Sequence, residues 1–194
     1  MIVAAGPWAP SLLRRAGVRL PIIGARGWLV HLAPATPALG QIVERGGWHT
    51  LAGQDVWRPL SAGQLAEGPP PNDVGSILQP NPDGTVLVGG SMQHTVAAEP
   101  EDHAVAGELV RRAVQIVPAL ADAEVLGAWW GTRPLTPDGR PFVGWTGDGL
   151  FVAVGHGSQG IILAGGTADL VGSLVSREEP ALDPVPFRPD RFAG

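Results

Sequence analysis

The chain has 194 residues, a length that allows one ordinary domain or parts of two. Its 13 Lys and Arg residues against 18 Asp and Glu residues give a net charge of −5, so nucleic acid would be repelled and is not expected as a partner. The absence of cysteine excludes disulfides, iron–sulfur clusters, thiolate zinc sites and a cysteine nucleophile, and any redox chemistry would need a cofactor. Glycine (28) and proline (20) are abundant, but 44% hydrophobic residues predict a folded, turn-rich chain.

Two features of the sequence indicate where in the cell the protein is expected. None approaches the roughly 18 residues that a membrane-spanning helix requires. The first residues lack the basic start of a secretion signal. The expected compartment is therefore the cytoplasm, with no transmembrane segment.

The first predicted element is the apolar run at residues 1–6, which is typical of a strand buried on both faces of a parallel sheet. A helix is predicted from about Trp8 to Ala16, with Pro10 in its first turn and Gly17 suited to its C-terminal cap. Because a parallel sheet needs other strands, this segment should belong to a larger sheet.

Residues 20–135 carry strand-like runs separated by Pro, Gly, Asn and Asp. A hairpin is predicted where residues 77–79 and 85–88 flank the turn at residues 80–84. The acidic residues at 99–102 predict a helix start, and Val105, Leu109 and Ala113 recur at helical spacing up to about Pro118.

A second buried strand is predicted at residues 150–154, after a turn at residues 136–139. The six residues 155–160 follow it directly and lead into a helix predicted from about Ile161 to Val175. The proline-rich tail from Arg177 onward predicts an extended strap along the surface.

Residues 155–160 have the spacing GxGxxG between a strand and a helix, which is the context of a dinucleotide-binding fingerprint. That fingerprint also requires a second parallel strand ending in an acidic residue, whereas Glu178 and Glu179 are followed by Pro180. A narrower interpretation remains: glycines let a planar ligand approach the backbone, and N–H groups that open a helix stabilise negative charge. The small residues of the helix predict close packing against a sheet or a cofactor; they are Ala164, Gly165, Gly166, Ala168 and Gly172.

Arg133 follows two tryptophans, Trp129 and Trp130, where low local polarity would strengthen a bidentate grip on a carboxylate. An ordinary ion pair with one of the acidic side chains is the alternative. The five histidines show no metal-ligand spacing, so no metal site is expected. Ser158 does not fit the pattern of a nucleophile elbow, because its glycine stands one place before the serine rather than two.

Several motifs, taken in order, resemble the FAD-dependent D-amino acid oxidase superfamily, and most closely its branch of glycine and sarcosine oxidases and small amino or imino acid dehydrogenases. They are residues 3–10, Arg26 with Gly27, residues 80–91, Trp129 with residues 131–134, residues 136–141, and Gly155, His156 and Gly157 with Gly160 and Ile161.

The resemblance implies an α+β fold in which the chain corresponds to the C-terminal portion of a two-domain flavoenzyme. Residues 1–19 would be part of a Rossmann-like, glutathione-reductase-type FAD-binding domain, and residues 20–135 the antiparallel sheet domain, with helices, that binds substrate. Residues 136–194 would return to the FAD-binding domain and end in the tail. The family's GxGxxG unit for the FAD pyrophosphate has no counterpart here, so a fragment or truncated gene is expected.

By position, the resemblance makes Arg133 the anchor of the substrate carboxylate and Trp129 the aromatic residue that precedes it. Ala5 and Gly6 would lie near the FAD phosphates. The flavin ring would face Gly155, His156, Gly157, Ser158, Gln159, Gly160 and Ile161. The implied chemistry is hydride transfer from a small amino or imino acid to flavin, with no acid–base residue required of the protein.

The resemblance leaves alternatives open. The family's usual Tyr before the hairpin turn is missing, and so the substrate, and whether the protein is an oxidase or a dehydrogenase, are undetermined. The chain could instead be a non-catalytic remnant or accessory subunit that binds a carboxylate ligand, or a partner through the strand edge at residues 1–5. A third alternative is assembly with a separate N-terminal FAD-binding half encoded by another gene.

Overall fold

A computed structural model of the chain describes residues 1–35, 39–45, 73–93, 103–147 and 149–192. The described residues form two compact units. Of these residues, unit 1 contains 1–24, 133–147 and 149–192, and unit 2 contains 25–35, 39–45, 73–93 and 103–132. None of the described helices is both long enough and apolar enough to cross a membrane.

Unit 2 is built on a five-stranded sheet with the strand order β3-β4-β5-β2-β6. Antiparallel pairing joins β3 to β4, β4 to β5, and β5 to β2, as predicted for this part of the chain. β2 begins, and β6 ends, in residues of unit 1. The strands are β2 (Ile23–Leu32), β3 (Val43–Arg45), β4 (Asp73–Pro80), β5 (Val86–Met92) and β6 (Val125–Leu135).

The hairpin predicted around residues 80–84 is present as β4 and β5, with Leu78 opposite Val88. The carboxylate of Asp83 accepts hydrogen bonds from the backbone N–H of Thr85 at 3.0 Å and from its hydroxyl at 2.6 Å. Gly84 has a φ of +86°, which a side chain would disfavour. Local turn chemistry therefore closes this hairpin.

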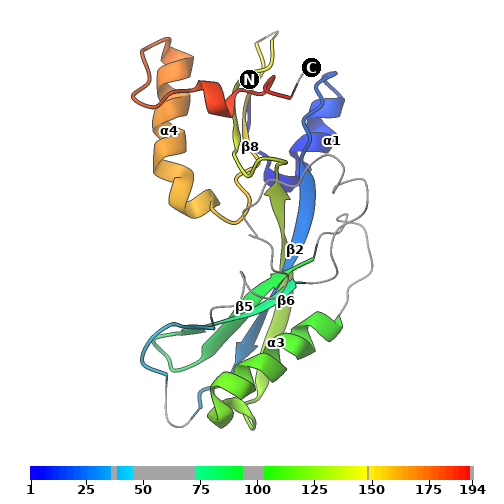
Figure 1. Cartoon of the computed structure of the whole chain (residues 1–194), viewed down its shortest axis with the longest axis vertical. Helices are drawn as coiled ribbons and strands as arrows, with labels where there is room; N and C mark the ends of the chain where they lie inside the picture. The colour runs from blue at the N-terminus through cyan, green and yellow to red at the C-terminus, as the bar shows by residue number, and fades with distance from the viewer. Residues whose placement is uncertain (36–38, 46–72, 94–102, 148, 193–194) are drawn as a thin grey trace. The chain divides into compact units, whose positions relative to one another are not determined.

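Helix α3 (His103–Ile116) covers one face of the unit 2 sheet by packing on β4 and β5 (Figure 1). Its buried residues include Val105, Leu109 and Ala113, which are the positions that the helical spacing predicted. The predicted helix start at residues 99–102 lies outside the described residues. The helix ends before Pro118, which opens the 3-10 helix η2 (Pro118–Leu120).

Unit 1 has a three-stranded sheet in the order β1-β8-β7, with α1 and α4 on opposite faces of β8 (Figure 1). β1 (Ile2–Val3) is parallel to β8 (Phe151–Val154), and β7 (Phe142–Trp145) is antiparallel to it. Side chains alternate along a strand, so Val152 packs with Leu13 of α1 (Ala9–Arg14) while Phe151 packs with Leu170 of α4 (Gly160–Ser176). The predicted first helix is split into the 3-10 helix η1 (Gly6–Trp8) and α1.

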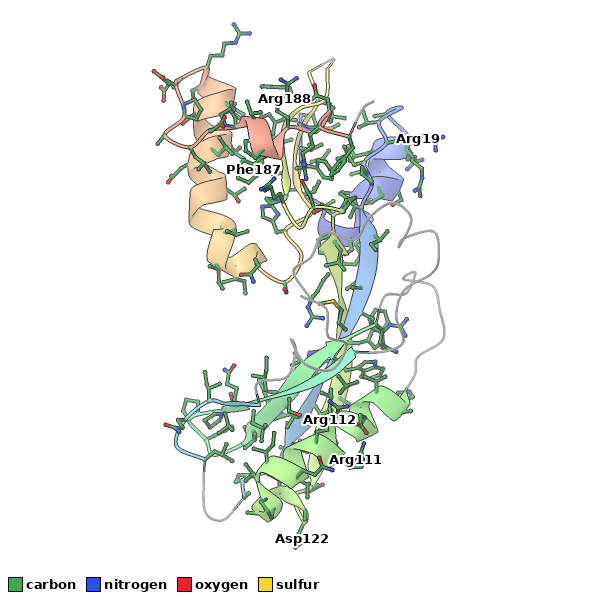
Figure 2. The ribbon with its side chains drawn as sticks, in the orientation of Figure 1. Arg19, Arg111, Arg112, Asp122, Phe187 and Arg188 are labelled. Carbon is green, nitrogen blue, oxygen red and sulfur yellow. The ribbon has the colours of Figure 1, made fainter. Side chains whose placement is uncertain are left out.

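Two expectations about unit 1 are wrong. β1 is not buried on both faces, because Val3 is buried under α1 whereas Ile2 is 50% exposed on the other face. The tail is not merely an extended strap, because it forms the 3-10 helix η3 (Val185–Phe187), and Phe187, labelled in Figure 2, packs against the buried cluster that contains Leu170 of α4. Contacts made by apolar and charged side chains of the tail therefore decide its conformation, although its prolines favour an extended backbone.

Candidate functional site

The loop at residues 155–159 connects the carboxyl end of β8 to the start of α4. Gly155 has a φ of +85° and Gly157 a φ of +57°, so both lie in the left-handed region that favours glycine. A Cβ at Gly155 would lie only 2.6 Å from Cγ2 of Thr136. The loop can therefore take this course only with glycine at its first position.

The end of β6 lies directly against this loop within unit 1. The backbone N–H of Gly157 donates to the carbonyl of Pro134 at 2.9 Å. A Cβ at Gly157 would lie 3.5 Å from Cδ2 of Leu135. Arg133, the predicted carboxylate anchor, is thus one residue away from a backbone contact with the predicted flavin-facing loop.

The guanidinium of Arg133 is partly removed from solvent. Burial lowers its pKa from the ordinary value, although an arginine side chain keeps its charge in proteins. A partly desolvated guanidinium binds a carboxylate more strongly than one in bulk water, and it can do so through two parallel hydrogen bonds. The electrostatics of this position suit an anion anchor.

His156 ties the loop to α4. Its Nε2 lies 3.0 Å from Oγ1 of Thr167, on the third turn of the helix. Burial lowers the pKa of His156 below its usual value, which favours the neutral imidazole. In that form it fixes the loop without adding positive charge beside it.

The start of α4 exposes backbone donors. Gln159 occupies the N-cap position, and no side chain of a described residue forms a capping hydrogen bond there. Ser158 is exposed, and Ile161 is 94% exposed in the first turn. Unpaired N–H groups at a helix N-terminus carry partial positive charge, so this end of α4 can stabilise an anion or a ring on which negative charge accumulates.

Ala5 and Gly6 follow β1 at the same sheet edge. Because β1 is parallel to β8, with Val3 opposite Val152, the segments that leave the two strands emerge side by side. Gly6 has a φ of +51°, and the carbonyl of Ala5 accepts a hydrogen bond from Trp8 at 3.0 Å. Unit 1 therefore brings together every predicted flavin-binding segment of the chain and the end of β6.

Trp129 is the predicted site residue that unit 1 does not contain. It lies in unit 2, four residues before Arg133 on β6, and its side chain is 46% exposed. Sequence reasoning missed Thr136 and Thr167, which contact the loop from a turn and from a helix. Neither belongs to a local motif that would have signalled the contact.

The spacing of the five histidines predicts no metal site. Two of these histidines, His49 and His94, lie outside the described residues. Within the described part of the chain, no group of three or more His, Asp or Glu side chains could hold a metal ion.

Comparison with known proteins gives a consistent match. The family model for FAD dependent oxidoreductases (DAO) matches residues 1–174. The glycine oxidase of Pseudomonas aeruginosa is 27% identical over 191 residues, which cover 97% of this chain and 45% of that protein. The D-amino acid dehydrogenase of Chromohalobacter salexigens is 25% identical over 196 residues, with coverage of 99% and 40%.

The fold matches as well. The crystal structure of glycine oxidase from Geobacillus kaustophilus aligns with a TM-score of 0.77 at 29% identity, and the match covers all of this chain and 45% of that one. The 194 residues therefore span somewhat less than half the length of the proteins that they resemble.

Proposed function

Because the chain belongs to the DAO family of FAD dependent oxidoreductases, we propose that it forms part of a flavoenzyme that oxidises the carbon–nitrogen bond of a small amino or imino acid. The observation that carries the proposal is the 2.9 Å hydrogen bond from Gly157 to Pro134, which holds the residue after Arg133 against the glycine loop. The names of the relatives, glycine oxidase and D-amino acid dehydrogenase, support a small amino acid as substrate.

We assign residues 1–19 and 136–194 to an FAD-binding domain and residues 20–135 to a substrate-binding domain. The division of the described chain near residues 24 and 133 supports this assignment. The two sheets also support it. The sheet of unit 2 is antiparallel, as expected of the substrate-binding domain, whereas the sheet of unit 1 is partly parallel and has helices on both faces, as expected of an FAD-binding domain.

The residues present fit one part of FAD. Gly157 leaves partly exposed backbone beside the start of α4, and Gly6 does so at the same sheet edge, whereas Gly155 is buried against Thr136. Planar rings and phosphates are both held by backbone of this kind. Gly155 to Ile161 would contact the isoalloxazine, and Ala5 and Gly6 would lie near the phosphates.

Bound FAD would supply the two-electron oxidation of the substrate. The residues of this chain bind and orient. Arg133 would hold the substrate carboxylate, and the N–H groups at the start of α4 would stabilise negative charge on the ring. Neutral His156 would keep the loop in place through Thr167.

The proposal is tested by measuring whether the protein binds flavin and whether an amino acid reduces that flavin. The chain is purified alone and after co-expression with the portion of the Geobacillus kaustophilus enzyme that it does not match, and each preparation is mixed anaerobically with glycine, sarcosine, proline and D-alanine. We expect bound flavin, yellow after gel filtration, that is bleached by at least one of these amino acids. Flavin that none of them reduces, or two colourless preparations, would contradict the proposal and favour a non-catalytic accessory role.

The role of Arg133 is tested in whichever preparation is active. Arg133→Leu should raise KM by about 10- to 100-fold, because a charge-assisted bidentate contact is lost, with flavin content unchanged. Arg140→Leu, which removes an exposed arginine from the same unit, is the control and should leave KM unaltered. Equal loss of flavin and of substrate affinity in Arg133→Leu would show that the residue is structural.

A further inference from the structure

Arg26 is a buried arginine on β2 of unit 2, outside the residues assigned above to flavin or substrate. It is 2% exposed, and its guanidinium lies over the indole of Trp130, with Cζ 4.4 Å from the centre of the ring. A guanidinium interacts with an aromatic face more strongly when water is removed from both. Because β2 and β6 are neighbours in the sheet, this contact joins two adjacent strands.

The backbone of Arg26 is fixed from the other side of β2. Its N–H and its carbonyl exchange two hydrogen bonds of 2.8 Å with Gln93, which follows β5. Oε1 of Gln93 also accepts a hydrogen bond from Nε1 of Trp28 at 3.1 Å. Trp28 belongs to the buried cluster between the sheet and α3. The position of Arg26 is therefore set by contacts that do not involve β6.

β6, in contrast, is weakly held within unit 2. It stands at the edge of the sheet, and none of its 11 residues, all of which the structure describes, is buried. Gly127 and Gly131 on either side of Trp130 have no side chain with which to pack. Trp130 is the residue of β6 that packs against the cluster under α3. The orientation of this part of β6 depends on how firmly Trp130 is held.

Trp129 is affected directly by that orientation. Consecutive side chains of a strand point to opposite faces of the sheet, so a Trp130 held on the α3 side places Trp129 on the other face. There Trp129 is 46% exposed, and Leu29 of β2, on the same face, is 36% exposed. A rotation or slip of β6 would carry the Trp129 ring away from this face.

We propose that Arg26 is a positioning residue for substrate binding. Its guanidinium holds Trp130 against the α3 side of the sheet, and Trp130 in turn orients β6 so that Trp129 presents its ring to the substrate. The contact of Trp129 with substrate rests on the proposed function, whereas the control of its orientation by Arg26 does not.

The first test observes the two tryptophans in the chain without flavin. The chain is produced with fluorotryptophan, and the fluorine NMR signals of Trp129 and Trp130 are assigned by their loss in Trp129→Phe and Trp130→Phe. Arg26→Met removes the charge but keeps an unbranched side chain, and it should move both signals by more than their linewidths. Arg26→Lys, which keeps a cation, should move them less.

Arg112→Met is the matched control, because Arg112 is another arginine of unit 2 that makes structural contacts. It pairs with Glu108 on α3 and donates to the carbonyl of Val74. Its loss should leave both fluorine signals in place. A Trp129 signal that ignores Arg26→Met, or that responds equally to Arg112→Met, would overturn the proposal.

Milder variants keep the test decisive if Arg26→Met does not fold. Arg26→Lys preserves a cation and Trp130→Phe preserves an aromatic ring, so each weakens the stacking without removing both partners. Each should still move the Trp129 signal by more than its linewidth. A Trp129 signal that is unchanged in both folded variants would refute the role of Arg26.

The second test uses the flavin-containing preparation that an amino acid reduces. Arg26→Met should raise KM by roughly 3- to 10-fold and change kcat by less than about twofold, with flavin content unchanged, because an aromatic contact is misplaced. In a Trp129→Leu background, Arg26→Met should raise KM no further, since the ring that it positions is already gone. An equally large effect in that background, or an unchanged KM beside a displaced Trp129 signal, would overturn the proposal.

The proposed function and the role of Arg26 can fail separately. If no amino acid reduces the bound flavin, the proposed function is refuted, and the fluorine signals still decide whether Arg26 orients Trp129. If flavin is reduced but Arg26→Met alters neither KM nor the Trp129 signal, the proposed function stands and the role of Arg26 is refuted.

Discussion

Gly155 is constrained both by its backbone and by its surroundings. Its φ of +85° is strained for any residue with a side chain, and a Cβ would approach Cγ2 of Thr136 to 2.6 Å. Gly172, in the same unit, has neither constraint, because it lies in the interior of α4 beside open space. The two glycines should therefore respond to the same substitution with opposite signs.

Gly155→Ala should lower the free energy of unfolding by about 2 to 4 kcal/mol, which combines the left-handed strain with the displacement of Thr136. Gly172→Ala should raise it by up to about 1 kcal/mol, because alanine is the better helix former. Urea denaturation followed by circular dichroism measures both. A stable Gly155→Ala variant would mean that the loop has another course than the one described.

At the scale of elements, the tail is held to unit 1 by Arg191. Its guanidinium donates to Asp138 at 2.8 and 2.9 Å and lies 3.8 Å from the centre of the Phe142 ring. Burial alone would raise the pKa of Asp138, but hydrogen bonds from Arg191 and from the backbone of Arg140, together with the positive charge of Arg191, lower it on balance. This ion pair joins the turn after β6 to the C-terminal segment.

Asp138→Asn should cost about 1 to 3 kcal/mol at pH 7, since a partly buried arginine loses its charged partner. A lowered folded-state pKa means that the stabilisation is complete above the unfolded value near pH 4 and is lost as the pH falls through the folded value. The difference between wild type and variant should therefore shrink in urea titrations at progressively lower pH. Asp190→Asn, at an exposed pair with Arg188, should change nothing measurable.

Elements set by short-range chemistry could be predicted, and those set by distant contacts could not. The turn at Asp83 and Gly84 and the spacing of Val105 and Leu109 act within a few residues, so the hairpin and α3 followed from the sequence. The Asp138–Arg191 pair spans 53 residues and has no local signature, so the tail was wrongly predicted as an extended strap.

The same limit applies to the candidate site. The strand, glycine loop and helix around Gly155 follow from the local pattern, but the contact between Gly157 and Pro134 joins separate elements. Only the family resemblance related Arg133 to that loop. The burial of β1 was misjudged because periodicity reports which residues are apolar, and not whether a neighbour covers Ile2.

At the scale of the whole chain, each unit has apolar clusters of its own. In unit 2, Leu109 and Trp28 belong to a cluster formed by the sheet and α3. In unit 1, Leu13 and Val152 belong to one cluster and Leu170 and Phe151 to another. A unit with its own core can unfold as a separate cooperative block.

Leu109→Ala tests whether the units behave in this way. The side chain is fully buried, so its truncation should cost about 2 to 5 kcal/mol, through lost apolar burial and the cavity left behind. If the units unfold separately, hydrogen exchange should accelerate in β4, β5 and α3 while β7, β8 and α4 keep their protection. Leu13→Ala, at a buried position of α1, should give the reverse pattern. Uniform loss of protection in either variant would show that the two cores unfold in a single cooperative transition, because a substitution in one core would then destabilise both equally.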